Sequence, residues 1–231
     1  MAPGLKPNLA ALLGCVLLIG LGEELWSRFI PPYLLALGGT AWMAAAYGTL
    51  RDLLDALYSY PGGWLNDRLG GCRALLLFTG LSLAGYVLYL VSPNGWVFLL
   101  GACLALAWTS FSMPALFDIV AKNLASEHRT WGFSLQAILK RVPLLLGPPL
   151  GGWLIARWGI LTGFRAGLVV TILLTAGALW LLAAYARPDA PARRDGRSAL
   201  SLWRAMDGRL KSLLGADILI RLAEGIPDVF V

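Results

Sequence analysis

The sequence predicts an all-α polytopic membrane protein, on three observations. The chain is 58% hydrophobic and 14% charged, whereas a soluble domain is about one quarter charged. Its apolar residues fall into segments near the length of about 20 residues that crosses a bilayer. Turn signals separate these segments. We therefore expect six membrane helices: Leu9–Ala36, Ala41–Leu65, Arg73–Val91, Trp96–Ala121, Trp131–Ala156 and Gly163–Tyr185.

The boundaries of these helices follow from local signals. Gly38-Gly39-Thr40 ends the first segment, and Ser92-Pro93-Asn94-Gly95 separates the third from the fourth. The first segment resembles a signal peptide, but Glu23 and Glu24 follow its apolar run where a cleavage site would stand. We therefore expect it to be a retained transmembrane helix.

The net charge of +6 is best explained by membrane orientation. With the N-terminus in the cytoplasm, twelve Lys and Arg residues fall inside, and only Arg157 and Arg165 fall outside. No basic face is interleaved with stacking aromatics, which excludes nucleic acid as a partner. Three widely spaced cysteines and one histidine form no disulfide framework or metal site. We expect an integral protein of a bacterial inner membrane, without a cofactor, and with the N-terminus and central linker cytoplasmic.

The chain divides into three expected parts. Residues 1–186 form the six-helix bundle, and residues 187–212 form a polar, cationic linker. Within and just beyond this linker, Ser198–Leu214 is either an amphipathic helix at the membrane surface or a solvated segment. Residues 213–231 begin a seventh apolar stretch that stops at Val231. We expect this stretch to be the start of a missing C-terminal half.

An internal repeat supports this organisation. Gly62-Gly63-Trp64-Leu65 recurs 89 residues later as Gly151-Gly152-Trp153-Leu154, and both copies continue to an arginine and a glycine. The offset spans three helices. Because three is odd, the second copy runs across the membrane in the opposite direction to the first. The bundle is therefore predicted to consist of two inverted three-helix repeats. A fainter match of Phe29–Pro32 with Gly225–Asp228 places the second half near Leu213.

These residues together resemble the major facilitator superfamily over the whole chain. The segment Gly63–Arg73 is similar to the family's cytoplasmic signature, and Gly147–Gly152 to its antiporter signature. The acidic-basic loop Ser126–Arg129 and the basic linker also match the family's pattern. The fourth segment, around Trp108–Phe117, departs from it by lacking an arginine-containing signature.

The resemblance implies a cytoplasmic gate in the loop after the second helix. Asp67 would accept hydrogen bonds from helix N-termini or from an arginine, and so help to close this side. Gly63 would permit close helix packing, and Gly70 a tight turn. The alternative is an ordinary topology loop. The predicted gate residues are Gly63, Asp67, Arg68, Gly70, Arg73 and Asp118.

Charged residues inside the membrane segments are candidates for coupling or substrate binding, because a bare charge there costs several kcal/mol. Glu24 and Arg28 share a helix face, as do Arg51 and Asp55. Each pair is either structural or functional, and the cations can bind an anionic substrate. The candidates are Glu23, Glu24, Arg28, Arg51, Asp52, Asp55, Lys140 and Arg141. A further motif is expected to bend the fifth helix: Gly147, Pro148, Gly151 and Gly152.

The resemblance implies a secondary active transporter that works by alternating access. We favour proton-coupled efflux by an antiporter, with a small-molecule substrate, protons and the lipid bilayer as partners. An organic anion or sugar importer is the alternative within this fold, and a non-transporting scaffold or receptor is the alternative of another class. An enzyme is not expected, because Asp52 and Asp55 lie beside Arg51 on one helix and His128 lies in a loop.

Overall fold

A computed structural model describes residues 7–109 and 129–185, together with 207–208, 212 and 216. The chain divides into two compact units, residues 1–192 and 193–231. All elements described below lie in the first unit. Its described residues form helices and turns without any strand, which confirms the all-α prediction.

The first expected helix is broken near its middle. Helix α1 spans Pro7–Glu24, a 3₁₀ turn η1 spans Ser27–Phe29, and helix α2 spans Ile30–Ala36. At the break, the Leu25 and Trp26 amides bond the carbonyl oxygens three residues earlier, at 3.3 and 3.4 Å. Two prolines occupy the first turn of α2, where a missing N–H donor interrupts no helix bond. The single helix Leu9–Ala36 is therefore corrected to two helices joined by a tighter turn.

The second and third helices meet at a single residue. Helix α3 spans Ala41–Leu69 and helix α4 spans Gly71–Val91. Between them Gly70 has a φ of +82°, and its amide bonds the Asn66 carbonyl at 2.9 Å. The expected loop over residues 63–73 is thus wrong, because glycine alone reverses the chain. Helix α5 then spans Gly95–Ala105, capped by Asn94, whose side chain accepts from the Val97 amide at 3.0 Å.

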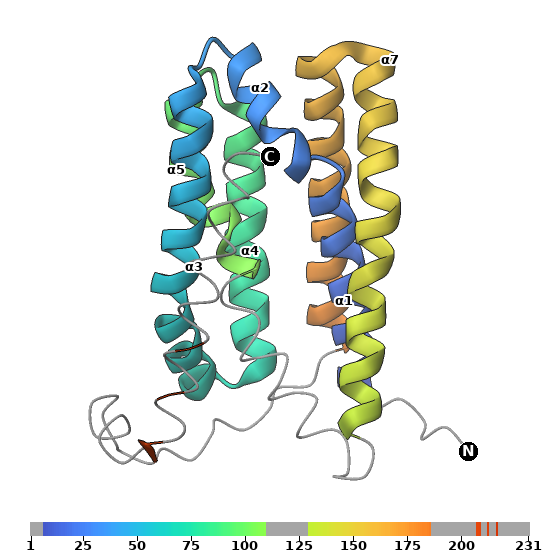
Figure 1. Cartoon of the computed structure of the whole chain (residues 1–231). Helices are drawn as coiled ribbons and strands as arrows, with labels where there is room; N and C mark the ends of the chain where they lie inside the picture. The colour runs from blue at the N-terminus through green and yellow to red at the C-terminus, as the bar shows by residue number, and fades with distance from the viewer. Residues whose placement is uncertain (1–6, 110–128, 186–206, 209–211, 213–215, 217–231) are drawn as a thin grey trace. The chain divides into compact units, whose positions relative to one another are not determined.

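Helix α7, Arg129–Tyr185, consists of two arms that meet at Gly159, where φ is +79°. Gly163 lets the arms approach closely, since a Cβ there would lie 2.6 Å from the Ile155 Cα. The backbone angles of Gly70 and Gly159 are nearly the same, with ψ of 154° and 168°. Figure 1 places the two turns at opposite ends of the unit. The three-helix repeat itself stays a prediction.

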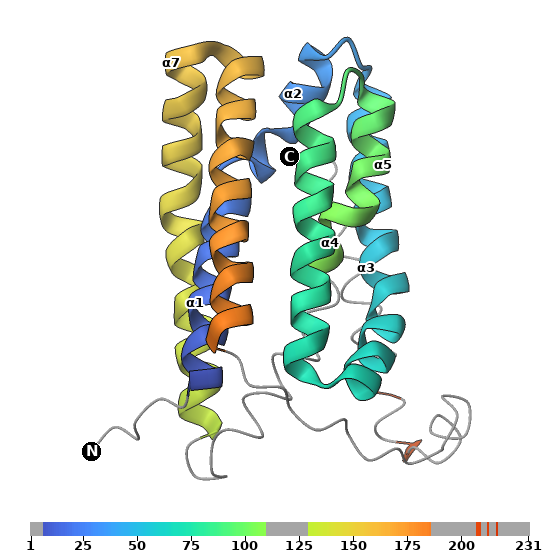
Figure 2. The same cartoon turned by 180° about the vertical axis from the view of Figure 1, so that it is seen from behind.

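The helices of this unit pack in two groups. Helix α1 lies along both arms of α7, while α3, α4 and α5 pack together (Figure 1, Figure 2). Helix α4 also packs against α7 and joins the groups. Among the described residues, Gly71–Val91 and the two-armed stretch Arg141–Tyr185 are long and apolar enough to cross a membrane.

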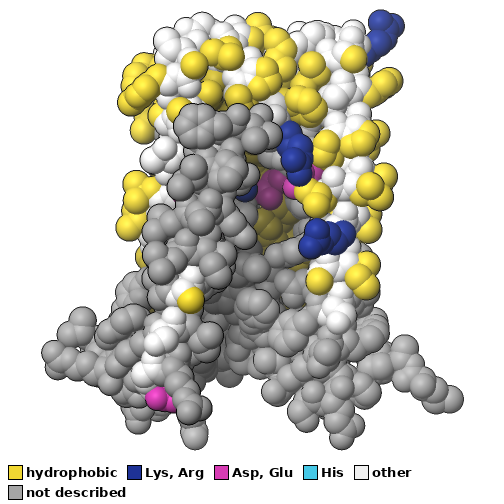
Figure 3. All heavy atoms as spheres, in the orientation of Figure 1, with side chains coloured by type: hydrophobic (Ala, Val, Ile, Leu, Met, Phe, Trp, Pro, Cys, Tyr) yellow, Lys and Arg dark blue, Asp and Glu magenta, His cyan; other side chains and the backbone are white. Residues whose placement is uncertain are grey.

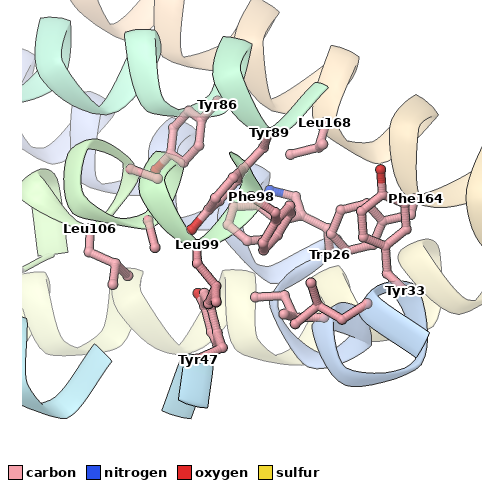
Figure 4. Close-up of a cluster of buried hydrophobic side chains, with 14 of the residues drawn as sticks. Trp26, Tyr33, Tyr47, Tyr86, Tyr89, Phe98, Leu99, Leu106, Phe164 and Leu168 are labelled. Atoms are coloured by element: carbon pink, nitrogen blue, oxygen red, sulfur yellow. The ribbon is translucent and has the colours of Figure 1, made fainter. Parts of the chain in front are cut away.

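An aromatic core lies at the break in α1. The ring of Tyr89 stacks on Phe98 with centroids 3.9 Å apart, and Tyr33 stacks on Phe164 at 3.8 Å. Trp26 meets Tyr86, Tyr89 and Phe164 edge-on. We call these residues the aromatic cluster: Trp26, Tyr33, Tyr86, Tyr89, Phe98 and Phe164 (Figure 4). Edge-on and offset ring contacts add to the energy of burial, so the cluster fixes α1, α2, α4, α5 and α7 at the level of the break.

Candidate functional site

Glu23 lies in the last turn of α1 and points to two hydroxyl groups. The Tyr86 hydroxyl of α4 donates to Glu23 Oε1 at 2.5 Å, and the Thr109 hydroxyl donates to the same oxygen at 3.2 Å. The side chain of Tyr86 is fully buried. Glu23 has no ion pair in the part of the chain that the structure describes. A carboxylate held by neutral donors can be ionised or protonated without breaking a salt bridge.

Glu24, the next residue, has a different partner. Its Oε2 atom lies 3.7 Å from Nε of Arg28. This distance exceeds that of a hydrogen bond, and Oε2 has no hydrogen-bond partner among the described residues. The Arg28 side chain is 58% exposed and that of Glu24 is 26% exposed. The structure thus brings the predicted pair together, but in a long contact.

Close packing against α7 holds the break in place. A Cβ on Gly147 would overlap Glu24 Cβ, and one on Gly151 would overlap the Leu25 carbonyl oxygen. These two glycines of the motif therefore allow α7 to approach the break closely. By contrast, Gly152 is in ordinary contact, 3.7 Å from the Phe29 ring. Pro148 lies inside the same arm of α7.

One threonine of α7 also binds the break from the other arm. The Trp26 indole N–H donates to the Thr171 hydroxyl at 3.1 Å. The same hydroxyl lies 2.7 Å from the Gly22 carbonyl and 2.8 Å from the Gly167 carbonyl. All of these groups are buried. Thr171 therefore links both sides of the break to α7.

The predicted gate residues lie where α3 turns into α4. Asp67, Arg68 and Arg73 are exposed, and none forms an ion pair among the described residues. The Arg68 guanidinium stacks over the Trp64 ring at 4.0 Å. Gly70 makes the expected turn, whereas a Cβ on Gly63 would meet no atom within 4 Å among the described residues, and its role in close packing stays a prediction. Asp118 lies outside the described residues.

The other predicted charges lie on α3 and α7. Arg51, Asp52 and Asp55 are exposed on α3. Arg141 is exposed on α7, and the side chain of Lys140 lies outside what the structure describes. Figure 3 shows acidic side chains within a hollow of one face and Lys or Arg side chains around it.

Sequence reasoning missed the partners of the charged residues. Tyr86 and Thr109 hold Glu23, and Thr171 holds Trp26. Each is a polar residue in a mostly apolar stretch, and its spacing carries no signal. In the described residues, His, Cys, Asp and Glu form no group of three that could hold a metal.

Comparisons with known proteins agree with this architecture. The sequence model of the Major Facilitator Superfamily matches residues 12–221. Monocarboxylate transporter 12-B of Danio rerio is 25% identical over 162 residues, which are 68% of this chain and 34% of that protein. An uncharacterized MFS-type transporter of Pseudomonas aeruginosa is 30% identical over 181 residues, covering 68% of this chain and 43% of its own length. Multidrug resistance protein MdtG of Klebsiella pneumoniae is 26% identical over 230 residues, covering 95% and 54%.

A solved structure shares the fold. The human organic anion transporter MFSD10 (TETRAN) aligns with a TM-score of 0.62 at 18% identity, over 80% of this chain and 48% of that one. At this identity the likeness shows the fold alone. The chain spans about half or less of the length of the curated relatives described above.

Proposed function

Because the chain belongs to the Major Facilitator Superfamily, we propose that it forms one half of a secondary active transporter that works by alternating access. Family membership makes it an integral membrane protein. The matched relatives are about twice as long or longer, which supports a C-terminal half as its partner. In this proposal the protein belongs to a bacterial inner membrane. Residues 1–186 are its first bundle, and the linker 187–212 lies in the cytoplasm. The substrate binds between the halves.

Proton coupling is carried by one observation, the arrangement around Glu23. When ionised, this carboxylate accepts from Tyr86 of α4 and Thr109 beyond α5. When protonated, the carboxyl group carries a donor of its own, so its bonds to both hydroxyls rearrange. A proton thereby changes how α1 is held against α4, which biases the equilibrium between the two access states. We propose export in exchange for protons, a direction supported by the name of the multidrug resistance relative.

Flux in proteoliposomes under an imposed pH gradient tests this proposal. The complete transporter should accumulate substrate against its gradient, whereas Glu23→Gln should retain only downhill exchange. Tyr86→Phe should shift the pH dependence of flux, because the ring stays and the hydroxyl is lost. Tyr33→Phe is the matched control, since its buried hydroxyl has no hydrogen-bond partner among the described residues. Uphill flux that survives Glu23→Gln would rule out this carboxylate as the coupling group.

We also propose the turn between α3 and α4 as a cytoplasmic gate, with Asp67 as its acceptor. The exposure of Asp67, Arg68 and Arg73 leaves them accessible to a second half. Asp67→Ala should slow transport, and Asp67→Asn should retain part of the rate because the amide still accepts hydrogen bonds. If Asp67→Ala transports at the native rate, the gate assignment fails.

A second candidate is import of an organic anion, which the exposed side chain of Arg28 favours. A non-transporting receptor is distinguished from both by flux, because it would bind a ligand without moving it. The family and its named relatives point to a transporter rather than an enzyme.

A further inference from the structure

The exposed cation beyond the break in α1 has the features of an anion site. We propose that Arg28 binds the carboxylate of an organic anion, and that Glu24 is the resting partner which this anion displaces. The inference rests on the proposed function, since a transporter half must contribute groups to the substrate site. It adds the substrate class and the residue that selects it.

The existing contact of Arg28 leaves most of its binding capacity unused. The side chain is 58% exposed, although Trp26 and Ile30 on either side of it are buried. Its contact with Glu24 uses Nε at 3.7 Å. Among the described residues, Glu24 is the one acidic side chain that forms an ion pair with Arg28. Guanidinium groups hold a carboxylate best by two parallel hydrogen bonds, and a ligand can supply the carboxylate that forms them.

The backbone of Glu24 cannot shift to improve the contact. Gly147 of α7 packs against Glu24 Cβ, and Gly151 packs against the Leu25 carbonyl. The backbone of the acid is therefore fixed, whereas the long side chain of Arg28 is free to turn. An exchange of partners then replaces a contact too long for a hydrogen bond with a bidentate pair.

Exposed residues of both signs lie in the same unit as Arg28. Arg51 and Arg141 are exposed cations, and Asp52 and Asp55 are exposed acids, so the class of ligand follows from Arg28 itself. Figure 3 shows Lys or Arg side chains around the hollow that contains acidic side chains. Phe29, the next residue, is half-buried and packs against Gly151 and Gly152 of α7. A monocarboxylate is the simplest ligand that satisfies the guanidinium of Arg28.

Equilibrium binding to the complete protein in lipid nanodiscs tests the inference with matched probes. Benzoate and hexanoate carry the charge, and benzamide and hexanamide have nearly the same shape without it. We expect both acids to bind more tightly than their amides. Arg28→Gln should weaken acid binding by about 10- to 100-fold, the effect of losing hydrogen bonds to a charged group. Arg28→Lys should fall between, because it keeps the charge and loses the planar fork.

The sign of the effect at Glu24 separates this inference from a structural ion pair. If Glu24 competes with the ligand, Glu24→Gln should bind the acids as tightly as the native protein or more tightly. If the pair is structural, Glu24→Gln should weaken binding as much as Arg28→Gln does, and the inference is overturned. Arg165→Gln is the control, since it removes an exposed arginine without an ion pair among the described residues.

The test does not depend on one variant. If Arg28→Gln does not fold, Arg28→Lys and the comparison of acids with amides on the native protein still show whether Arg28 binds the carboxylate. Acids that bind no more tightly than their amides overturn the inference. Because the readout is binding, acid binding without flux would overturn the proposed function and support this site.

Discussion

Two adjacent glycines of α7 permit a sharp test of how its first arm packs against the break in α1. An alanine Cβ at position 151 would overlap the Leu25 carbonyl oxygen and lie 2.8 Å from its carbon. It would also lie 3.0 Å from the Phe29 ring. Backbone atoms cannot rotate away, so α1 and α7 must separate. At position 152 the nearest atom is 3.7 Å away, which is ordinary contact.

The magnitudes follow from the two surroundings. Overpacking lowers the free energy of unfolding by about 1–3 kcal/mol. A clash with backbone atoms lies at the upper end of this range, about 3 kcal/mol. Alanine gains about 1 kcal/mol over glycine in a helix, so Gly151→Ala should lose about 2 kcal/mol of unfolding free energy. Gly152→Ala causes no clash, so only the higher helix propensity of alanine acts, and the free energy of unfolding should rise by about 1 kcal/mol. At about 2–4 °C per kcal/mol for a chain of this size, the two midpoints should differ by about 6–12 °C.

Thermal unfolding of the purified variants in one detergent, followed by circular dichroism, measures this difference. Each variant adds one methyl group to the same helix, so detergent and propensity effects cancel in the comparison. Equal midpoints for Gly151→Ala and Gly152→Ala would refute the close approach of α7 to α1.

Two further pairs of variants test the hydrogen bonds and the turn. Thr171→Val should lose about 1–2 kcal/mol of stability because the Trp26 indole is left without its acceptor. Thr175→Val should be neutral or stabilising, since its buried hydroxyl has no partner among the described residues. If the unfolding midpoints of Thr171→Val and Thr175→Val fall equally, the hydrogen bond between Trp26 and Thr171 is contradicted. Gly70→Ala should lose about 1–3 kcal/mol, because its φ of +82° and ψ of 154° lie in a region almost confined to glycine. Gly48→Ala, in open space within α3, should gain up to about 1 kcal/mol, and the two midpoints should move in opposite directions.

Much of the helical framework could be predicted because lipid imposes it. The apolar segments and their turns predicted the bounds of α3 and α4 and the start of α5 within a few residues, whereas α5 ends at Ala105 rather than at the expected Ala121. The i,i+4 spacing of Glu24 and Arg28 predicted that they share a face, and the structure places them in contact. The reversal at Gly70 also followed from residue type, since only glycine tolerates such a conformation without strain.

What depended on contacts between helices could not be predicted. The partners of Glu23 come from 63 and 86 residues away, and Tyr86 looks like any other aromatic of an apolar helix. The break at Leu25 and Trp26 contains neither Gly nor Pro. It is stabilised from outside, by Thr171 and by the glycines of α7. Gly63 was predicted to pack closely because of its type, but a Cβ there would meet no atom within 4 Å among the described residues.

Two neighbouring acids at the end of α1 have different surroundings. Glu23 and Glu24 both lie in the last turn of this helix and differ by a rotation of about 100°. Here Glu23 is bound to α4 through Tyr86, while the backbone of Glu24 is packed against α7. Motion of α1 relative to α4 must therefore disturb the Glu23 bonds. Exchange of Arg28 disturbs the Glu24 contact instead, on the opposite side of the break. Because both groups lie on one short segment that Trp26 anchors, we expect a change at one to affect the other.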